Sequence, residues 1–224
     1  MMKLEIELQA VSGGTLDSFQ ALRSSIMYMN DTKVISFTST TPLEGKSVLS
    51  FYTAVSFASL NKKTLFIDCD MRKSHINRYF SVKTKQNKIF GLSEYVSGQS
   101  EDLIYETNYP NLHMIPSGKC PPDPSGILSS TAFEKILKLA RENFDYIIID
   151  TPPVTVAGDA CIAGRKSDGV IYVVKDNAIK SRDARHSIAL LERSECRILG
   201  VVSNMVSRNN SNSYYYSSYG YYNE

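Results

Sequence analysis

The stretch Lys33-Val-Ile-Ser-Phe-Thr-Ser-Thr-Thr-Pro-Leu-Glu-Gly-Lys-Ser-Val48 combines three kinds of local structure. Its apolar, β-branched start predicts a buried strand, its proline-bearing middle a loop, and Gly45-Lys46-Ser47 an amphipathic helix that runs to about Leu60. The first turn of a helix has unpaired N–H groups and partial positive charge, and a glycine lets the main chain approach an anion closely. The stretch therefore predicts a phosphate-binding loop, in which Lys46 contacts the phosphates and Ser47 ligates Mg²⁺.

The match to the phosphate-loop pattern is incomplete. The pattern G-x-x-x-x-G-K-[ST] requires glycine at position 40, where this chain has Thr40. A lone Gly-Lys-Ser at a helix start is a weak signal, so the interpretation depends on two further segments. The predicted nucleotide contacts are Glu44, Gly45, Lys46, Ser47 and Val48.

Two other apolar segments end in aspartates. Thr64-Leu-Phe-Ile-Asp-Cys-Asp-Met-Arg72 carries Asp68 and Asp70, and Asp145-Tyr-Ile-Ile-Ile-Asp-Thr-Pro-Pro153 carries Asp150. Each aspartate alone could simply cap a turn. Because parallel sheets bind ligands at the carboxyl ends of their strands, all three together predict a site for Mg²⁺ and a nucleoside triphosphate.

Composition narrows the class of protein. The chain has 224 residues, enough for one α/β domain with a substantial core, and 25 Lys and Arg against 23 Asp and Glu. This near-neutral balance argues against a dedicated nucleic-acid or anionic-membrane surface. There is no apolar run of transmembrane length, and the N-terminal Met-Met-Lys-Leu-Glu-Ile-Glu lacks a signal-peptide pattern. The dispersed cysteines predict reduced thiols of a cytosolic protein: Cys69, Cys120, Cys161 and Cys196.

The order of predicted elements indicates the fold class. Apolar strands alternate with helices, which predicts an α/β fold with a mostly parallel sheet covered by helices on both faces. The predicted helices are 15–29, 46–60, 91–96, 131–143 and 181–195, and the predicted strands are 34–37, 64–68, 111–116, 146–149, 170–174 and 198–202. The prolines of Ser117-Gly-Lys-Cys-Pro-Pro-Asp-Pro124 predict an irregular loop.

The character of the chain changes near Ser207. We expect a folded domain over residues 1–206 and a flexible tail over 207–224, because the tail has no aliphatic residue and no period. Six of the 14 tyrosines lie in this tail: Tyr214, Tyr215, Tyr216, Tyr219, Tyr221 and Tyr222. They are either phosphoacceptors presented to an active site or a low-complexity surface that mediates assembly by stacking.

Taken together, these motifs resemble the bacterial tyrosine kinases, specifically the short cytoplasmic type of Gram-positive capsule and exopolysaccharide loci. The likeness covers essentially the whole chain, including the loop at 116–125. It implies a P-loop ATPase fold like that of partitioning and division-site ATPases, with Gly45, Lys46 and Ser47 in Walker A. Asp68 and Asp70 then form the family's second aspartate motif, and Asp150 forms Walker B.

The resemblance also implies an activity and a set of roles. The expected reaction is transfer of phosphate from ATP to protein tyrosines, with Lys46, Asp68, Asp70 and Asp150 as catalytic residues. We expect Ser47, Asp70 and Asp150 to hold Mg²⁺, and Asp68 to orient the attacking hydroxyl and accept its proton. For Arg72, two roles remain open: it steadies phosphate charge or pairs with a surface acid.

Two departures from the family pattern carry consequences. Leu43 stands where the loop usually has glycine, so we expect weakened ATP affinity if its backbone φ is positive and tolerance if it is negative. The helical self-association motif E-x-x-R-x-x-R here reads Asp17, Gln20 and Arg23, which puts ring assembly in doubt.

The resemblance implies several partners and a location. They are a separate membrane-spanning activator whose cytoplasmic end docks on the kinase, neighbouring protomers, and a cognate tyrosine phosphatase. The chain would then lie in the cytoplasm, at the inner face of the membrane. Two alternatives are a nucleotide-driven ATPase switch of the division-site or partitioning type, and a degenerate ATPase that serves as a scaffold. The switch class usually has a second lysine where this chain has Thr40.

Overall fold

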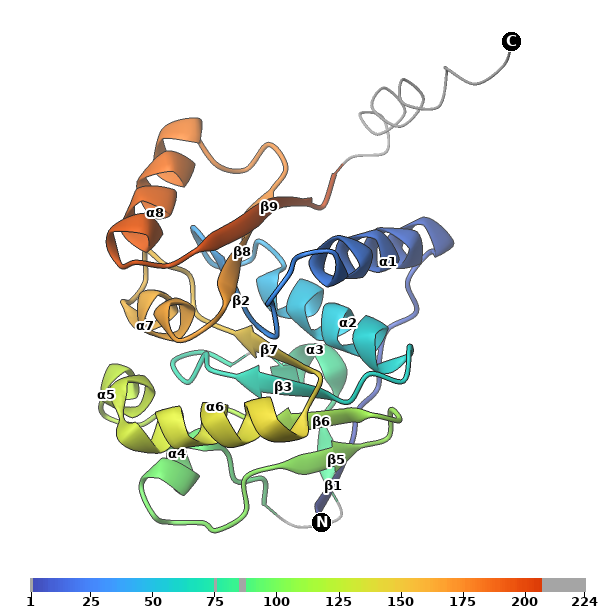
Figure 1. The fold of residues 1–224 in the computed structure, drawn as a ribbon, viewed down its shortest axis with the longest axis vertical. Helices are drawn as coiled ribbons and strands as arrows, with labels where there is room; N and C mark the ends of the chain where they lie inside the picture. The colour runs from blue at the N-terminus through green and yellow to red at the C-terminus, as the bar shows by residue number, and fades with distance from the viewer. Residues whose placement is uncertain (1, 75, 85–87, 207–224) are drawn as a thin grey trace.

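The structure is a computed structural model that describes residues 2–74, 76–84 and 88–206 (Figure 1). The strands are β1 (Met2–Glu5), β2 (Val34–Ser39), β3 (Thr64–Asp68), β4 (Lys83–Thr84), β5 (Tyr105–Thr107), β6 (Leu112–Ile115), β7 (Tyr146–Asp150), β8 (Gly169–Lys175) and β9 (Ile198–Asn204). The helices are α1 (Gly13–Met27), α2 (Lys46–Ala58), α3 (Ile76–Phe80), α4 (Leu92–Val96), α5 (Pro124–Ser129), α6 (Thr131–Asn143), α7 (Asp159–Arg165) and α8 (Ser181–Arg193). The tail 207–224, with its six tyrosines, lies outside the described residues.

The described strands form one sheet in the order β4-β1-β5-β6-β3-β7-β2-β8-β9. Every pair from β6 to β9 is parallel, as is β1 with β5, whereas β4 runs antiparallel to β1 and β5 antiparallel to β6. The predicted, mostly parallel sheet is confirmed. Because β3, β7 and β2 are adjacent, the segments that carry Asp68, Asp150 and the phosphate loop leave the sheet side by side.

Helices cover both faces of the sheet, as predicted (Figure 1). On one face, α1, α2 and α3 bury a core that includes Phe37 of β2 and Phe66 of β3. On the other, α4, α5, α6 and α7 bury Leu65 and Ile147, and α8 packs with α7 over β8. Alternate residues of one strand serve opposite cores, which explains why the central strands are buried along almost their whole length.

Helix α2 differs from the amphipathic helix that the sequence predicts, because it is buried on nearly all sides. The sheet covers its inner side and α1 covers much of the outer side. Phe19 of α1 stacks on Tyr52 of α2 with 5.1 Å between ring centroids, and Arg23 donates to the backbone and hydroxyl oxygens of Ser56 at 3.0 Å each. The helix that begins at the phosphate loop is therefore held from both sides.

Several short elements escape prediction from the pattern. Strands β1, β4 and β5 are too short and too polar for a hydrophobic period to identify them. The irregular loop predicted up to Pro124 is wrong at its end, because Pro124 begins α5. Asp123 caps that helix by accepting from the Gly126 N–H at 2.9 Å, and proline is tolerated in the first turn of a helix, where its missing N–H would be unpaired anyway.

A half-buried carboxylate fixes the start of β2. Asp168, just before β8, accepts from the backbone N–H groups of Lys33 at 2.8 Å and Val34 at 2.7 Å, and from both terminal nitrogens of Arg141 on α6. Partial burial works to raise the pKa of Asp168, but the hydrogen bonds from Arg141, Val34 and Lys33 outweigh it and hold the pKa below its usual value. The strand that leads into the phosphate loop thus depends on one acid.

We predict that Asp168→Asn lowers the free energy of unfolding by about 1–2 kcal/mol, a value discounted for solvent screening of the ion pair. The folded-state pKa is depressed, so the charge contributes its stability above the unfolded pKa of about 4 and loses it as pH falls through the folded pKa. Urea unfolding at pH 7 and near pH 3 should therefore show the two proteins converging in acid. A difference that is unchanged in acid would contradict this account.

Candidate active site

The three predicted strand ends meet as expected. Asp68 at the end of β3 lies directly opposite Asp150 at the end of β7, and Asp150 in turn lies opposite Phe37 of β2. The N–H of Cys69 donates to the Asp150 carbonyl at 2.8 Å, which extends the pairing beyond the last ladder residue. Both aspartates are almost completely buried, at 1% exposure each. Two carboxylates on adjacent parallel strands therefore sit together beside the phosphate loop.

The phosphate loop turns sharply at Gly45, the N-cap of α2. Gly45 has a φ of 81°, which strains any residue with a side chain. A Cβ at this position would also lie 2.2 Å from the side-chain nitrogen Nδ2 of Asn204 and 3.1 Å from Cε of Met205. Only glycine satisfies both constraints, so the main chain enters α2 with its first N–H groups free to face an anion.

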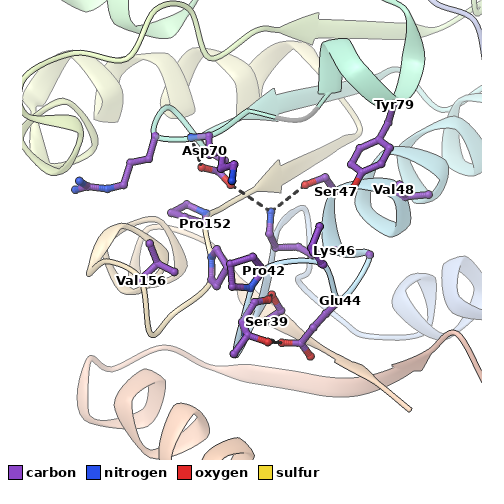
Figure 2. A pocket seen from close by; sticks show the side chains of 16 residues that line it. Ser39, Pro42, Glu44, Lys46, Ser47, Val48, Asp70, Tyr79, Pro152 and Val156 are labelled. Atoms are coloured by element: carbon purple, nitrogen blue, oxygen red, sulfur yellow. Dashed lines mark hydrogen bonds and ion pairs between the residues drawn. The ribbon is translucent and has the colours of Figure 1, made fainter. Parts of the chain in front are cut away.

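The ammonium of Lys46 occupies the centre of the site (Figure 2). It lies 2.8 Å from Oδ1 of Asp150, 3.0 Å from Oγ of Ser47 and 3.9 Å from Oδ2 of Asp70, and Lys46 is only 5% exposed. The structure thus brings together four of the five residues that the sequence predicts for catalysis or metal binding, and the fifth, Asp68, lies opposite Asp150 on the adjacent strand. A buried ion pair of this kind costs desolvation energy, so its presence at a strand edge indicates function rather than stability.

The donor set around Lys46 fits a magnesium ion. Oδ2 of Asp150 is buried and has no hydrogen-bond partner among the described residues, and the Ser47 hydroxyl and Asp70 carboxylate lie beside the same ammonium. With Asp68, these carboxylates carry more negative charge than one lysine offsets. Mg²⁺ in phosphoryl-transfer sites binds one or two carboxylates and takes its remaining oxygens from phosphate and water. Ser47, Asp70 and Asp150 would hold it.

Asp68 lies apart from Lys46 and has its own partners. Its Oδ1 accepts from the Asp70 N–H at 3.0 Å and its Oδ2 from the Ser74 hydroxyl at 2.5 Å. Burial, and next the negative charge of Asp150, raise the pKa of Asp68 to about 7, although the Ser74 hydrogen bond works in the opposite direction. A carboxylate with a pKa near 7 is well matched to accept a proton at neutral pH.

The Glu44 side chain supports the loop from within. Its Oε1 accepts from the N–H and hydroxyl of Thr41, and its Oε2 accepts from the Lys175 N–H at the end of β8. The backbone oxygen of Glu44 accepts from the amide nitrogen of Asn204 at 2.8 Å. Any contact of Glu44 with a nucleotide would therefore come from its main chain.

The two sequence departures in the loop have different structural outcomes. Thr40, which replaces the first glycine of the pattern, is buried and hydrogen-bonds to the Tyr172 hydroxyl. Leu43 has a φ of 69° and its side chain is 70% exposed at the mouth of the pocket. The condition for weakened ATP affinity is therefore met at Leu43, and the weakening itself stays a prediction.

Arg72 has a partner that the sequence does not reveal. Its guanidinium lies 2.7 Å and 3.2 Å from the two carboxylate oxygens of Asp159 in the first turn of α7, and it also donates to Ser125 of α5. Arg72 therefore does pair with an acid, but Asp159 is fully buried, so the prediction that this acid lies on the surface is wrong. The pair anchors the segment after Asp70 to two helices on the other side of the pocket. No sequence signal links residues 87 positions apart.

The helical self-association motif is partly occupied within the chain. Asp17 and Gln20 are exposed on α1, but Arg23 makes its hydrogen bonds to Ser56 of α2. Assembly through α1 stays a prediction.

The four cysteines are free thiols, as expected.

Comparisons with known proteins agree with this geometry. The ParA family, described as NUBPL iron-transfer P-loop NTPase, matches residues 32–219. Tyrosine-protein kinase CpsD of Streptococcus agalactiae serotype Ia is 38% identical over 196 residues, which are 86% of this chain and 83% of that protein. The chain belongs to the bacterial tyrosine kinases.

Two further comparisons describe how this kinase relates to others. The crystal structure of the chimerical protein CapA2B2 matches with a TM-score of 0.78 and 32% identity, over 85% of each chain. Tyrosine-protein kinase wzc of Salmonella typhimurium is 29% identical over 96% of this chain but only 30% of its own length. The tyrosine kinase therefore corresponds to one part of that longer protein.

We predict that Leu43→Gly strengthens MgATP binding, because glycine adopts a φ of 69° without the steric cost that leucine carries there. That cost is about 1–2 kcal/mol and weakens binding only as far as the unbound loop relaxes out of this φ, so the dissociation constant should fall by at most roughly fivefold to thirtyfold. Leu43→Ala is the matched control, since it removes bulk but keeps a Cβ. Titration calorimetry with MgATP should place Leu43→Ala near the wild type, and equal gains in both variants would attribute the effect to bulk instead.

Proposed function

We propose that this chain is an ATP-dependent protein-tyrosine kinase that phosphorylates its own C-terminal tyrosine cluster and thereby regulates capsule or exopolysaccharide synthesis and export. The observation that carries the proposal is the buried Lys46 ammonium at the start of α2, within 4 Å of Asp150, Asp70 and Ser47. Membership of the bacterial tyrosine kinase family supports phosphate transfer from ATP to tyrosine as the reaction. The acceptors we propose are Tyr214, Tyr215, Tyr216, Tyr219, Tyr221 and Tyr222.

The phosphate loop would bind the donor. The N–H groups of the first turn of α2 and the ammonium of Lys46 would contact phosphate oxygens, and Lys46 would leave Asp150 to do so. Ser47, Asp70 and Asp150 would hold Mg²⁺, whose charge would offset the negative charge of the transferring phosphoryl group. Apolar side chains line this pocket: Pro42, Pro152 and Val156, which Figure 2 labels, together with Leu43 and Pro153. They would limit the access of water to the reacting atoms.

Asp68 would serve the acceptor. A tyrosine phenol has a pKa of about 10, so roughly one in a thousand is ionised at neutral pH. Asp68 would accept the phenolic proton as the oxygen attacks the γ-phosphorus and the bond to the ADP oxygen breaks. Ser74 now donates a hydroxyl hydrogen to Oδ2 of Asp68, which shows that this oxygen accepts from a hydroxyl group.

We further propose that the kinase works at the inner face of the cell membrane through a separate membrane-anchored activator. Among the residues the structure describes, no helix has the length and apolar character needed to cross a bilayer. This chain matches only 30% of the length of wzc. That supports a separate partner that would provide the role of the unmatched part of wzc. Neighbouring protomers and a cognate tyrosine phosphatase are the other partners we propose.

Two observations favour the kinase over the alternatives. In the nucleotide-switch alternative, a lysine usually stands at position 40, but the Thr40 side chain here is buried against Tyr172. A scaffold without nucleotide chemistry gains little from a buried lysine paired with two aspartates, because the desolvation of buried charges can exceed the Coulombic gain of their pairing.

Lys46→Met should abolish phosphate transfer, because the loop loses its only positive side chain next to Asp150 within the described part of the site. We expect a fall of at least about a hundredfold in the rate. The variant leaves Asp150 without its cation, so thermal unfolding should be recorded in parallel to show that the fold survives. Intact-mass spectrometry after incubation with MgATP measures transfer, and undiminished phosphorylation in a folded Lys46→Met protein would refute the site assignment.

Replacing all six tail tyrosines by phenylalanine should remove most autophosphorylation while leaving ATP hydrolysis and thermal stability unchanged. Peptide mass spectrometry locates the modified residues. The matched control replaces a tyrosine of the folded domain, Tyr28, which is 87% exposed. Phosphate that persists at the same level in the six-residue variant would show that the tail is not the main acceptor.

A further inference from the structure

A second cavity lies beside the nucleotide pocket and shares Arg72 and Lys73 with it. It encloses about 450 Å³, within the range of roughly 300–1,000 Å³ typical of ligand sites. Asp68 and Ser74 line it, and the Pro116–Gly118 loop forms the opposite wall. The segment from Asp70 to Lys73 thus separates two cavities, one with Lys46 and one with Asp68. Asp68 is only 1% exposed, so an acceptor that enters from this side would reach its Oδ2 by displacing the Ser74 hydroxyl, without crossing the phosphate loop.

The wall of this cavity is held in place by a buried carboxylate. Glu94 of α4 is 3% exposed and accepts from the N–H groups of Gly91 at 3.0 Å and Lys119 at 3.2 Å. The Leu92 N–H donates to the Pro116 carbonyl at 2.8 Å. Burial works to raise the pKa of Glu94, but these N–H donors outweigh it and lower the pKa, so the acid stays charged. These hydrogen bonds hold the backbone of the loop at Lys119 and so fix the position from which its side chain extends.

The mouth of the second cavity is positively charged. Lys73, Lys119 and Arg72 line it, and Arg72 is neutralised by Asp159. Lys73 and Lys119 are exposed, and no carboxylate of the described residues lies within ion-pair distance of either ammonium. Among the described residues, two cations without an ion pair therefore line the same cavity as Asp68, in a chain whose net charge is only +2.

We propose that Lys119, with Lys73 beside it, makes this cavity prefer acceptor tyrosines that have a negatively charged group next to them in the sequence. The group is the carboxylate of a flanking acidic residue or the phosphate of a neighbouring phosphotyrosine. The inference rests on the proposed function, because it takes the second cavity as the place where an acceptor phenol meets Asp68. In a cluster such as Tyr221-Tyr222, each phosphorylation would make the adjacent tyrosine a better substrate.

Peptide binding without nucleotide tests this preference directly. The probes are labelled, end-blocked peptides of residues 217–223 with Tyr219→Phe, so that Tyr221 is the one acceptor. Position 222 carries Tyr222→Gln, Tyr222→Glu or phosphotyrosine, which separates the two sources of negative charge. Fluorescence anisotropy with the unphosphorylated full chain should give dissociation constants about two- to fivefold lower for glutamate than for glutamine, and up to about tenfold lower for phosphotyrosine.

Charge variants identify the cations responsible. Lys119→Gln should bring the ratio of dissociation constants towards one, whereas Lys138→Gln, an equal charge loss on the exposed side of α6, should leave the ratio unchanged. Lys73 also lines the nucleotide pocket, so Lys119 is the diagnostic residue. Raising the salt concentration to about 0.5 M should also shrink the wild-type preference.

The outcomes separate this inference from the proposed function. Equal affinity for all three peptides overturns the inference, as does a preference that survives both Lys119→Gln and Lys73→Gln. The same peptides are then incubated with MgATP and analysed by mass spectrometry. Phosphate on Tyr221 without any effect of position 222 leaves the kinase standing and removes the charge preference, whereas no phosphate on any peptide or on the tail counts against the kinase itself.

Discussion

One buried cation among carboxylates governs the organisation of this molecule. Lys46 is the first residue of α2. Its ammonium lies between the carboxylates of Asp150 and Asp70, whose negative charges would otherwise repel each other. The parallel sheet explains how this is possible, because residues far apart in the sequence leave adjacent strands at one edge. The arrangement stores an unfavourable charge cluster that a nucleotide with its metal ion is suited to relieve, and the surrounding cores supply the stability that the cluster lacks.

The segment after β3 has a double role in this design. Asp70 lies beside Lys46 in the phosphate pocket, Asp68 at the end of β3 lines the second cavity, and Arg72 anchors the segment by pairing with the buried Asp159. Both sides therefore depend on one short stretch of backbone. A change in the position of α7 or α5, which hold that anchor, would reach both cavities at once. Under the proposed function, donor and acceptor would be positioned by the same support.

Sequence reasoning recovered the central architecture because its physical basis is local. Continuous apolar runs identified β2, β3, β7 and β8, and the residues that follow them identified Lys46, Asp68, Asp70 and Asp150. The short strands β1, β4 and β5 are specified by pairing with distant segments, which no local period records. Side-chain partnerships were equally out of reach, since Arg72 with Asp159 and Glu94 with the 116–119 loop exist only after the chain has folded. The positive φ of Leu43 could be posed as a question from the sequence but answered only by the backbone.

The amide of Asn204 at the end of β9 ties the last described strand to the phosphate loop, and Met205 lies next to Gly45. The end of the last described strand thus lies beside the phosphate loop. Four strand spacings of about 4.8 Å separate β9 from β3, a span of roughly 19 Å, and each further residue of chain adds up to about 3.5 Å of reach. Under the proposed function, this short span would give the tail tyrosines a high effective concentration at their own active site. An acceptor cavity would then need only weak affinity for each tyrosine.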